Sequence, residues 1–124
     1  MRVFKFTRFS RYARKEGISD NELMEVVDIL EADQADANLG GNVYKVRIAR
    51  LGEGKSGGHR AIIYFKNEFR TIFAYCFPKS EKANINDKEL RAFKIDAKKH
   101  LAFTDEELNL SVKNGILIEI FKEN

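Results

Sequence analysis

The sequence predicts an α+β fold, a single domain over residues 1–124 with the element order β-α-α-β-β-β-α-α-β. Three observations predict it. Three strand-like runs follow one another between Asn42 and Lys82 without a helical segment between them. Segments with helical periodicity and capping residues lie on either side of these strands. The length of 124 residues suits one domain with one hydrophobic core.

The N-terminal third predicts one strand and two helices. Val3–Thr7 is rich in β-favouring residues, and helical spacing of the apolar residues begins at Thr7 and ends at Gly17. Ser19 and Glu22 form a Ser-x-x-Glu capping box, which predicts the start of a second helix. That helix is expected to end near residues 31–33, and residues 33–41 are expected to form a loop.

The first central strand alternates between two faces. Lys45 and Arg47 lie on one face, which is expected to point outward, and Val46 and Ile48 lie on the other, which is expected to point to the core. The next two strands are predicted over His59–Phe65 and Thr71–Phe77. A tight turn at Asn67-Glu68 joins them, and Pro78 stops the last one.

The C-terminal third predicts two helices and a final strand. Asn86 or Asp87 caps the first helix, and Thr104-x-x-Glu107 is a capping box for the second, which Gly115 ends. The final strand is predicted over Ile116–Phe121. The expected apolar stripe of the first helix consists of Leu90, Phe93, Ile95, Ala97 and Leu101.

The basic charge is concentrated in the central strands. Residues 42–82 hold nine Lys or Arg and three Glu, so they carry +6, whereas the whole chain carries +3. A cationic surface on one sheet indicates a polyanionic partner. The nine cations are Lys45, Arg47, Arg50, Lys55, Arg60, Lys66, Arg70, Lys79 and Lys82.

Composition excludes several other classes of protein. The chain has no apolar run of membrane-spanning length, and its N-terminus does not resemble a signal peptide. The single cysteine, Cys76, lies in an apolar run and is expected to be a buried structural thiol. No His, Cys, Asp or Glu residues have metal-ligand spacing, so neither a metal nor a cofactor is predicted. The expected compartment is the cytoplasm.

The loop GEGKSGGHR is the sharpest local feature. Its glycines let the backbone approach a ligand, and Lys55 and Arg60 supply cations beside it. It lacks the GxxxxGK[ST] spacing and the following helix of a P-loop. If the strands are adjacent, Arg60 approaches Lys79 and Lys82, and an anion would neutralise these cations. The alternatives are a flexible hairpin connection and a solvated basic rim.

Neither histidine has a settled role. His59 is expected inside the basic cluster, where it is a candidate general base, and a surface histidine without a role is the alternative. His100 lies near the end of a helix, where an interaction with the helix terminus suffices. Ser56 has no recognisable histidine and aspartate partners for nucleophilic chemistry.

Four segments together resemble the RelE superfamily of bacterial toxin–antitoxin toxins, and most closely its HigB-like branch. They are VFKFTRFSRYARKEGISD, ANLGGNVYKVRIARLGEGKSGGHRAIIYF, FAYCFPKSEKANI and KNGILIEI. The most specific signal is Gly-Lys-Ser-Gly-Gly-x-Arg followed by Phe-x-Lys-x-Glu-x-x-Asn-Ile. The second motif comprises Phe77, Lys79, Glu81, Asn84 and Ile85.

The resemblance implies a small, mostly antiparallel sheet flanked by helices, and a metal-independent mRNA interferase. Such a toxin binds mRNA and rRNA at the ribosomal A site, and its activity is held in check by a cognate antitoxin. The 2′-hydroxyl of the mRNA attacks the adjacent phosphate and leaves a 2′,3′-cyclic phosphate. This chemistry needs a base, an acid and stabilisation of the phosphorane charge.

The resemblance also assigns roles to residues. Arg60 resembles the arginine that stabilises the transition state, and Lys55 resembles a lysine of the active cluster. Lys79 and Lys82 lie where relatives place further cations. Some relatives carry a tyrosine after the position of Lys82, whereas here the nearest aromatic residues are Tyr75 and Phe77. The expected catalytic residues are Lys55, His59, Arg60, Lys79 and Lys82, and the expected RNA-binding residues are Lys45, Arg47, Arg50 and Phe77.

Two other functions remain open at this point. One is a binding module that keeps the RNA-binding surface without cleaving, which the absent tyrosine favours. The other is a toxin of the same superfamily that inhibits DNA gyrase. In each toxin reading, an antitoxin segment with acidic residues and an apolar stripe would complement the basic sheet.

Overall fold

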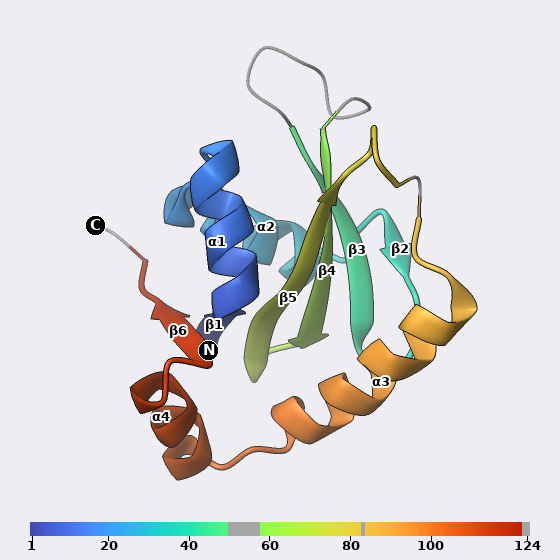
Figure 1. Ribbon diagram of the computed structural model, residues 1–124. Helices are drawn as coiled ribbons and strands as arrows, with labels where there is room; N and C mark the ends of the chain where they lie inside the picture. The colour runs from blue at the N-terminus through green and yellow to red at the C-terminus, as the bar shows by residue number, and fades with distance from the viewer. Residues whose placement is uncertain (50–57, 83, 123–124) are drawn as a thin grey trace.

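The computed structural model describes residues 1–49, 58–82 and 84–122. In these residues the chain is α+β with a mostly antiparallel sheet and four helices, as predicted, and the sheet has six strands instead of the five expected (Figure 1). The strand order is β2-β3-β4-β5-β1-β6, and β1 pairs with β5 in parallel. The elements are β1 (Arg2–Phe6), α1 (Thr7–Glu16), α2 (Asp20–Glu31), β2 (Ala37–Asn38), β3 (Val43–Ile48), β4 (His59–Lys66), β5 (Arg70–Pro78), α3 (Asp87–Leu101), α4 (Asp105–Lys113) and β6 (Leu117–Ile120).

One predicted loop contains an additional strand. β2 lies within residues 33–41, and its two residues pair with Tyr44 and Lys45 of β3. A tight turn returns the chain to β3, because Gly40 and Gly41 both adopt positive φ and the Gly40 carbonyl accepts from the Val43 N–H at 3.0 Å. A strand of two residues is too short to show alternation in the sequence, so only the pairing reveals it.

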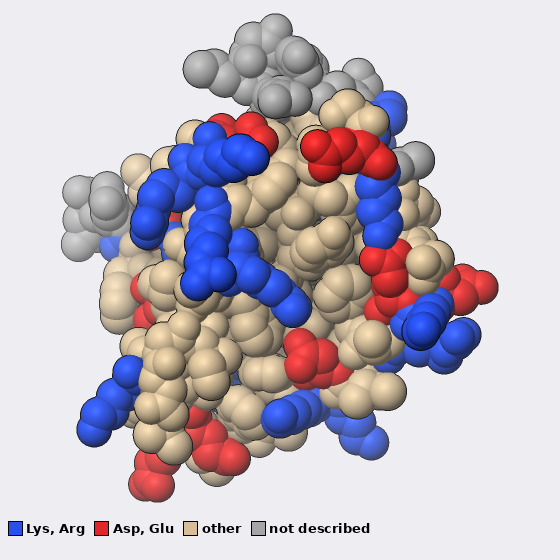
Figure 2. Space-filling model, viewed as in Figure 1, with Lys and Arg blue, Asp and Glu red and all other residues tan. Residues whose placement is uncertain are grey.

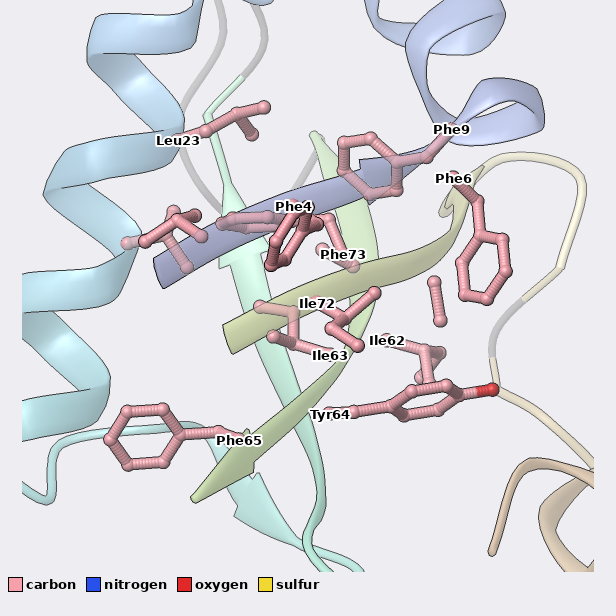
Figure 3. Packing of buried hydrophobic residues seen from close by; sticks show 14 of the residues in the cluster. Phe4, Phe6, Phe9, Leu23, Ile62, Ile63, Tyr64, Phe65, Ile72 and Phe73 are labelled. Atoms are coloured by element: carbon pink, nitrogen blue, oxygen red, sulfur yellow. The ribbon is translucent and has the colours of Figure 1, made fainter. Parts of the chain in front are cut away.

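The helices α1, α2 and α3 lie on different sides of the sheet. Figure 1 shows α2 behind the sheet, α3 across its front, and α1 continuing beyond β1 along the edge of β5. Figure 3 shows the aromatic and aliphatic core, in which Phe4, Phe73 and Tyr64 are fully buried. None of the helices in the described residues is long and apolar enough to cross a membrane.

The predicted capping boxes are present at the starts of three helices. The Ser19 hydroxyl accepts from the Glu22 N–H at 3.2 Å, and the Thr104 hydroxyl accepts from the Glu107 N–H at 3.1 Å. Asn86, rather than Asp87, caps α3. These interactions satisfy backbone N–H groups that the first turn of a helix leaves without partners. Because they involve only neighbouring residues, the sequence alone predicts where these helices start.

The prediction for Ile95 is wrong, because 73% of this residue is exposed instead of packing with the apolar stripe of α3. Residue 95 lies two positions after Phe93 and two before Ala97, so on a helix it points away from both. Phe93 packs against Tyr64 and Tyr75 of the sheet, whereas Ile95 faces solvent.

The end of α3 is held by a cation from the sheet. Arg70, at the start of β5, donates from one guanidinium nitrogen to the carbonyl oxygens of His100, Leu101 and Phe103 at 2.9–3.1 Å. A cation at a helix C-terminus interacts favourably with the helix dipole and with the carbonyls of the last turn. Burial lowers the pKa of Arg70. Arg70 therefore has a structural role at this end of the sheet.

Candidate active site

A row of two cations and an aromatic ring crosses the front of the sheet. Arg47 of β3 pairs with Arg60 of β4, and Arg60 pairs with Phe77 of β5. Directly paired residues share a face, so these three side chains lie on the face that α3 partly covers. The row below it holds Lys45, Ile62 and Tyr75. The prediction that Lys45 and Arg47 share a face is confirmed, and Val46 and Ile48 on the other face are buried.

The segment after β5 brings further polar side chains to this front face. The Lys82 ammonium lies 5.9 Å from the centre of the Phe77 ring and forms an ion pair with Glu89 at the start of α3. Its hydrogen bond lowers the pKa of Glu89. Lys45 donates to the Asn84 side chain at 3.4 Å. The end of β5 therefore lies beside the start of β4, as predicted, and Lys82 approaches the row that contains Arg60.

Lys79 is exposed, and its backbone anchors the strand ends. Its N–H donates to the Gly58 carbonyl at 3.1 Å, directly before β4 begins. Lys79 and Lys82 thus follow a strand that is fixed against the first residues of β4. Lys55 and Arg50 lie outside the described residues.

The two arginines of the front row differ in exposure. Arg60 is 6% exposed, and its guanidinium donates to the carbonyl of His59 at 3.4 Å. Arg47 is exposed and forms an ion pair with Asp36, which also accepts from the Arg47 backbone N–H at 2.6 Å. An exposed ion pair contributes little stability, about 0.2–1 kcal/mol, so a phosphate can compete for the Arg47 side chain.

His59 does not lie inside the basic cluster, so that part of the prediction is wrong. Strand alternation places it on the back of the sheet, where it is 1% exposed. Its Nδ1 shares a 2.6 Å hydrogen bond with the Tyr12 hydroxyl of α1, and the two rings meet edge to face. The alternative of a surface histidine is also wrong, because α1 and the sheet enclose the ring.

His100 is also buried and is bound through its own helix. Its Nδ1 lies 3.1 Å from the carboxylate of Asp96, one turn earlier in α3. Asp96 also accepts from the Tyr64 hydroxyl at 2.7 Å. Burial disfavours the charged carboxylate, but the bonds from His100 and Tyr64 outweigh it and lower the pKa of Asp96. His100 therefore stabilises the packing of α3.

Cys76 is buried, as the sequence predicts. Burial raises the pKa of its thiol to about 12, so the thiol stays protonated at neutral pH.

A cavity of about 300 Å³ opens between α1 and the upper edge of β5. It forms because β1 pairs with β5 only as far as Phe73, so the last residues of β5 face α1 instead of another strand. Residues from both faces of β5 meet there with a charged residue of α1, Arg8, and one from the segment after β5, Glu81. The lining residues are Arg8, Phe9, Tyr12, Tyr75, Cys76, Phe77, Pro78 and Glu81.

α1 was not expected from the sequence to be part of the site. Arg8, Arg11 and Lys15 are exposed and recur at helical spacing with Tyr12, so they share one side of α1. Figure 2 shows Lys and Arg gathered over α1, with an uncharged area beside them toward β5. The signal was present as an i, i+3, i+4, i+7 pattern, but the chain had to fold before this helix lay beside Phe77.

The site combines cations with aromatic rings, and proteins use both kinds of side chain to bind nucleic acids. Lys and Arg side chains bind phosphate oxygens, and aromatic faces stack on unpaired bases. Tyr75 and Phe77 have ring centres 5.6 Å apart, and both line the cavity beside α1. Phe77 is only 3% exposed, so Tyr75 presents the more accessible of the two rings.

A comparison with protein families identifies the family of this chain. The family model described as the RelE toxin of the RelE / RelB toxin-antitoxin system matches residues 1–120, which is nearly the whole chain. This family implies an antitoxin as partner. The chain belongs to the RelE toxin family.

Proposed function

We propose that this toxin is a ribosome-dependent mRNA endonuclease of the HigB-like branch, which inhibits translation by cutting mRNA in the ribosomal A site. The observation that carries the proposal is the front row of Arg47, Arg60 and Phe77, with Lys82 beside the ring. These cations could bind phosphates at one end of the sheet, where the ring of Phe77, 3% exposed, lies beside Arg60.

The proposed reaction needs only the RNA and protein side chains. The 2′-oxygen forms a bond to the adjacent phosphorus, and the bond from phosphorus to the 5′-oxygen breaks. The proton of the 2′-hydroxyl passes to a base, and an acid gives a proton to the leaving 5′-oxygen. Arg60 stabilises the negative charge on the phosphorane oxygens, where one well-placed donor contributes about 3 kcal/mol.

The remaining cations hold the RNA on either side of the scissile phosphate. Lys79 and Lys82 follow β5 and act with Lys55 in the proposed active cluster. Lys45, Arg47 and Arg50 bind flanking phosphates, and Phe77 stacks on a base. Such a distribution makes binding fall with added salt, because each neutralised phosphate releases counterions.

We assign the acid/base work to the hydrogen-bonded pair of Tyr12 and His59. Tyr12 lines the cavity beside Phe77, whereas His59 lies behind it on the back of the sheet. We propose that Tyr12 meets the RNA from this cavity, and that His59, which shares a hydrogen bond with the Tyr12 hydroxyl, orients it and exchanges a proton with it. In this role Tyr12 takes the place of the tyrosine that some relatives carry after the position of Lys82.

The decisive test is cleavage on translating ribosomes, with the mRNA ends mapped for the wild-type toxin and Arg60→Ala. Wild type should cut within the A-site codon and leave 2′,3′-cyclic phosphates, and Arg60→Ala should cut about 100-fold more slowly. Arg60→Lys, which keeps the charge but loses the planar fork, should fall between them. Full toxicity of a folded Arg60→Ala toxin would contradict the assignment.

A non-cleaving RNA-binding module is the second candidate, and one observation favours it. Both histidines of the chain lie away from the front row, His59 on the back of the sheet and His100 at the end of α3. Ribosome binding by the wild-type toxin without any cyclic-phosphate product would support the binding module. A supercoiling assay separates both functions from inhibition of gyrase.

A further inference from the structure

An apolar groove lies at the opposite end of the sheet from the candidate active site. Its volume is about 560 Å³, and it runs between α3, the turn that precedes β3 and the end of β4. The lining residues are Gly41, Asn42, Lys66, Lys94, Ile95, Lys98, Leu101 and Ala102.

The groove is part of the packing between α3 and the turn before β3. Gly40 and Gly41 adopt φ of 86° and 60°, and an added Cβ at Gly41 would lie 3.0 Å from the Lys94 side chain. The aliphatic stem of Lys94 therefore packs directly on this turn. Ile95, 73% exposed, stands beside it, so the groove presents apolar surface to solvent.

Among the described residues, all charged residues that line the groove are lysines. Lys94 and Lys98 lie one turn apart on α3, and Lys66 faces them from the end of β4. The carboxylate of Asp96 does not neutralise them, because it is bound to Tyr64 and His100. Lysines that surround an exposed isoleucine complement a partner with carboxylates on either side of an apolar stripe.

The groove and the front row are separate surfaces. Arg60 and Lys66 lie six positions apart on β4, which corresponds to about 20 Å along an extended strand. No aromatic residue is among the described residues that line the groove, whereas Tyr75 and Phe77 line the cavity beside α1. These properties favour a protein helix over RNA as the occupant.

We propose that this groove binds an acidic amphipathic helix of the antitoxin. Apolar side chains of the helix pack on Ile95 and Leu101, and Asp or Glu side chains pair with Lys66, Lys94 and Lys98. The inference rests on the proposed function for the identity of the partner. The antitoxin then holds the toxin about 20 Å from Arg60, so its bulk keeps the toxin out of the A site without filling the cavity beside α1.

The test measures binding of the cognate antitoxin, purified from the native complex, to the toxin and its variants. Ile95→Asp should weaken binding about 100-fold, and the double variant Lys94→Glu/Lys98→Glu about tenfold. The matched controls are Ile116→Asp and Lys113→Glu, which alter an exposed isoleucine and an exposed lysine outside the groove. Both controls should bind as wild type does, and circular dichroism should show that all four variants are folded.

Growth assays and cross-linking give independent readouts. Cells that carry Ile95→Asp should remain arrested even when the antitoxin is co-expressed. A photo-crosslinking residue at position 95 should attach to an acidic helical segment of the antitoxin. Unchanged antitoxin affinity in both groove variants overturns the proposal, as does attachment of position 95 to rRNA or to a second copy of the toxin.

Failure of the proposed function would give a different result. If the wild-type toxin makes no cuts in mRNA, the endonuclease assignment fails, while the antitoxin titration still shows whether the groove binds an acidic helix. If cleavage is present and the groove variants bind the antitoxin normally, only the docking surface is wrong.

Discussion

Arg60 and Arg70 are both buried arginines of the β4–β5 hairpin, at opposite ends of the sheet, and their surroundings differ. Arg70 donates to three carbonyl oxygens at the end of α3. Arg60 lies in a row with a second arginine and the ring of Phe77. The first holds the fold together, whereas the second brings positive charge to a face that we propose binds RNA.

The difference shows that a count of charges gives the net charge of a segment but not which of its cations have a structural role. Both arginines contribute to the +6 of residues 42–82. Like charges that share one face raise the electrostatic potential there and attract an anion, whereas a guanidinium bound to helix carbonyls compensates a helix dipole. The comparison is tested most directly by changing one arginine at a time.

The largest expected effect on stability comes from Arg70→Met. It removes three hydrogen bonds from a buried cation and leaves the last carbonyls of α3 without this donor, so the free energy of unfolding should fall by about 3 kcal/mol. Denaturation by urea, monitored by circular dichroism, measures the change. Cleavage by the fraction that stays folded should match wild type.

Arg60→Met is the matched change at the other end of the sheet, and its main effect should be on cleavage. The assignment of different roles to Arg60 and Arg70 is wrong if Arg70→Met slows cleavage by the folded protein as much as Arg60→Met does. The two arginines would then act on one site, despite lying at opposite ends of the hairpin.

Tyr12→Phe should have the next largest effect. It removes the hydroxyl that shares a 2.6 Å bond with His59, so we expect a loss of about 1 kcal/mol in stability and cleavage slowed by more than tenfold. The pH dependence of kcat/KM should change as well, which a purely structural loss would not produce. An unaltered pH profile with the same stability loss would limit the pair to holding α1 on the sheet.

Asp96→Asn tests the docking of α3 near Arg70 by its dependence on pH. The pKa of Asp96 is lowered in the folded state, so its contribution to stability is present above the pKa of the unfolded chain and is lost as the pH falls through the lower folded pKa. At pH 7 the variant should be about 1 kcal/mol less stable. The difference should shrink below about pH 4, as thermal melts from pH 7 to pH 2.5 can measure.

If the stability difference between wild type and Asp96→Asn stayed the same at the lowest pH, the shape of the side chain rather than its charge would hold Tyr64 and His100. Tyr64→Phe serves as the control, because it removes one of the two bonds and leaves the carboxylate in place.

The smallest effects on ribosome binding should come from two exposed lysines at the two ends of the sheet. Lys79→Ala should weaken ribosome binding about threefold and lower the slope of log affinity against log salt by about one. Lys66→Ala should leave ribosome binding unchanged, because that lysine lies at the far end of β4, where it approaches the Phe69 ring. Equal losses in both variants would show that the whole sheet contributes to RNA binding.

Local signals in the sequence located most of the elements. The capping boxes at Ser19 and Thr104 and the alternation of Lys45 with Val46 depend only on neighbouring residues, and each was found in the structure. The adjacency of Arg60 and the end of β5 followed from the tight hairpin. β2 was missed because two residues carry no pattern, and Ile95 was counted in the apolar stripe of α3 although its position on the helix turns it away from Phe93 and Ala97.

The sequence alone predicts an α+β protein with a basic central sheet and motifs that resemble the RelE family. Which cations lie beside one another depends on the tertiary structure. Pairing of β3, β4 and β5 places Arg47 and Arg60 beside Phe77. Arg70, in contrast, binds carbonyl oxygens at the end of α3 and so has a structural role. His59 lies on the back of the sheet, where it contacts Tyr12, because successive side chains of a strand point to opposite faces.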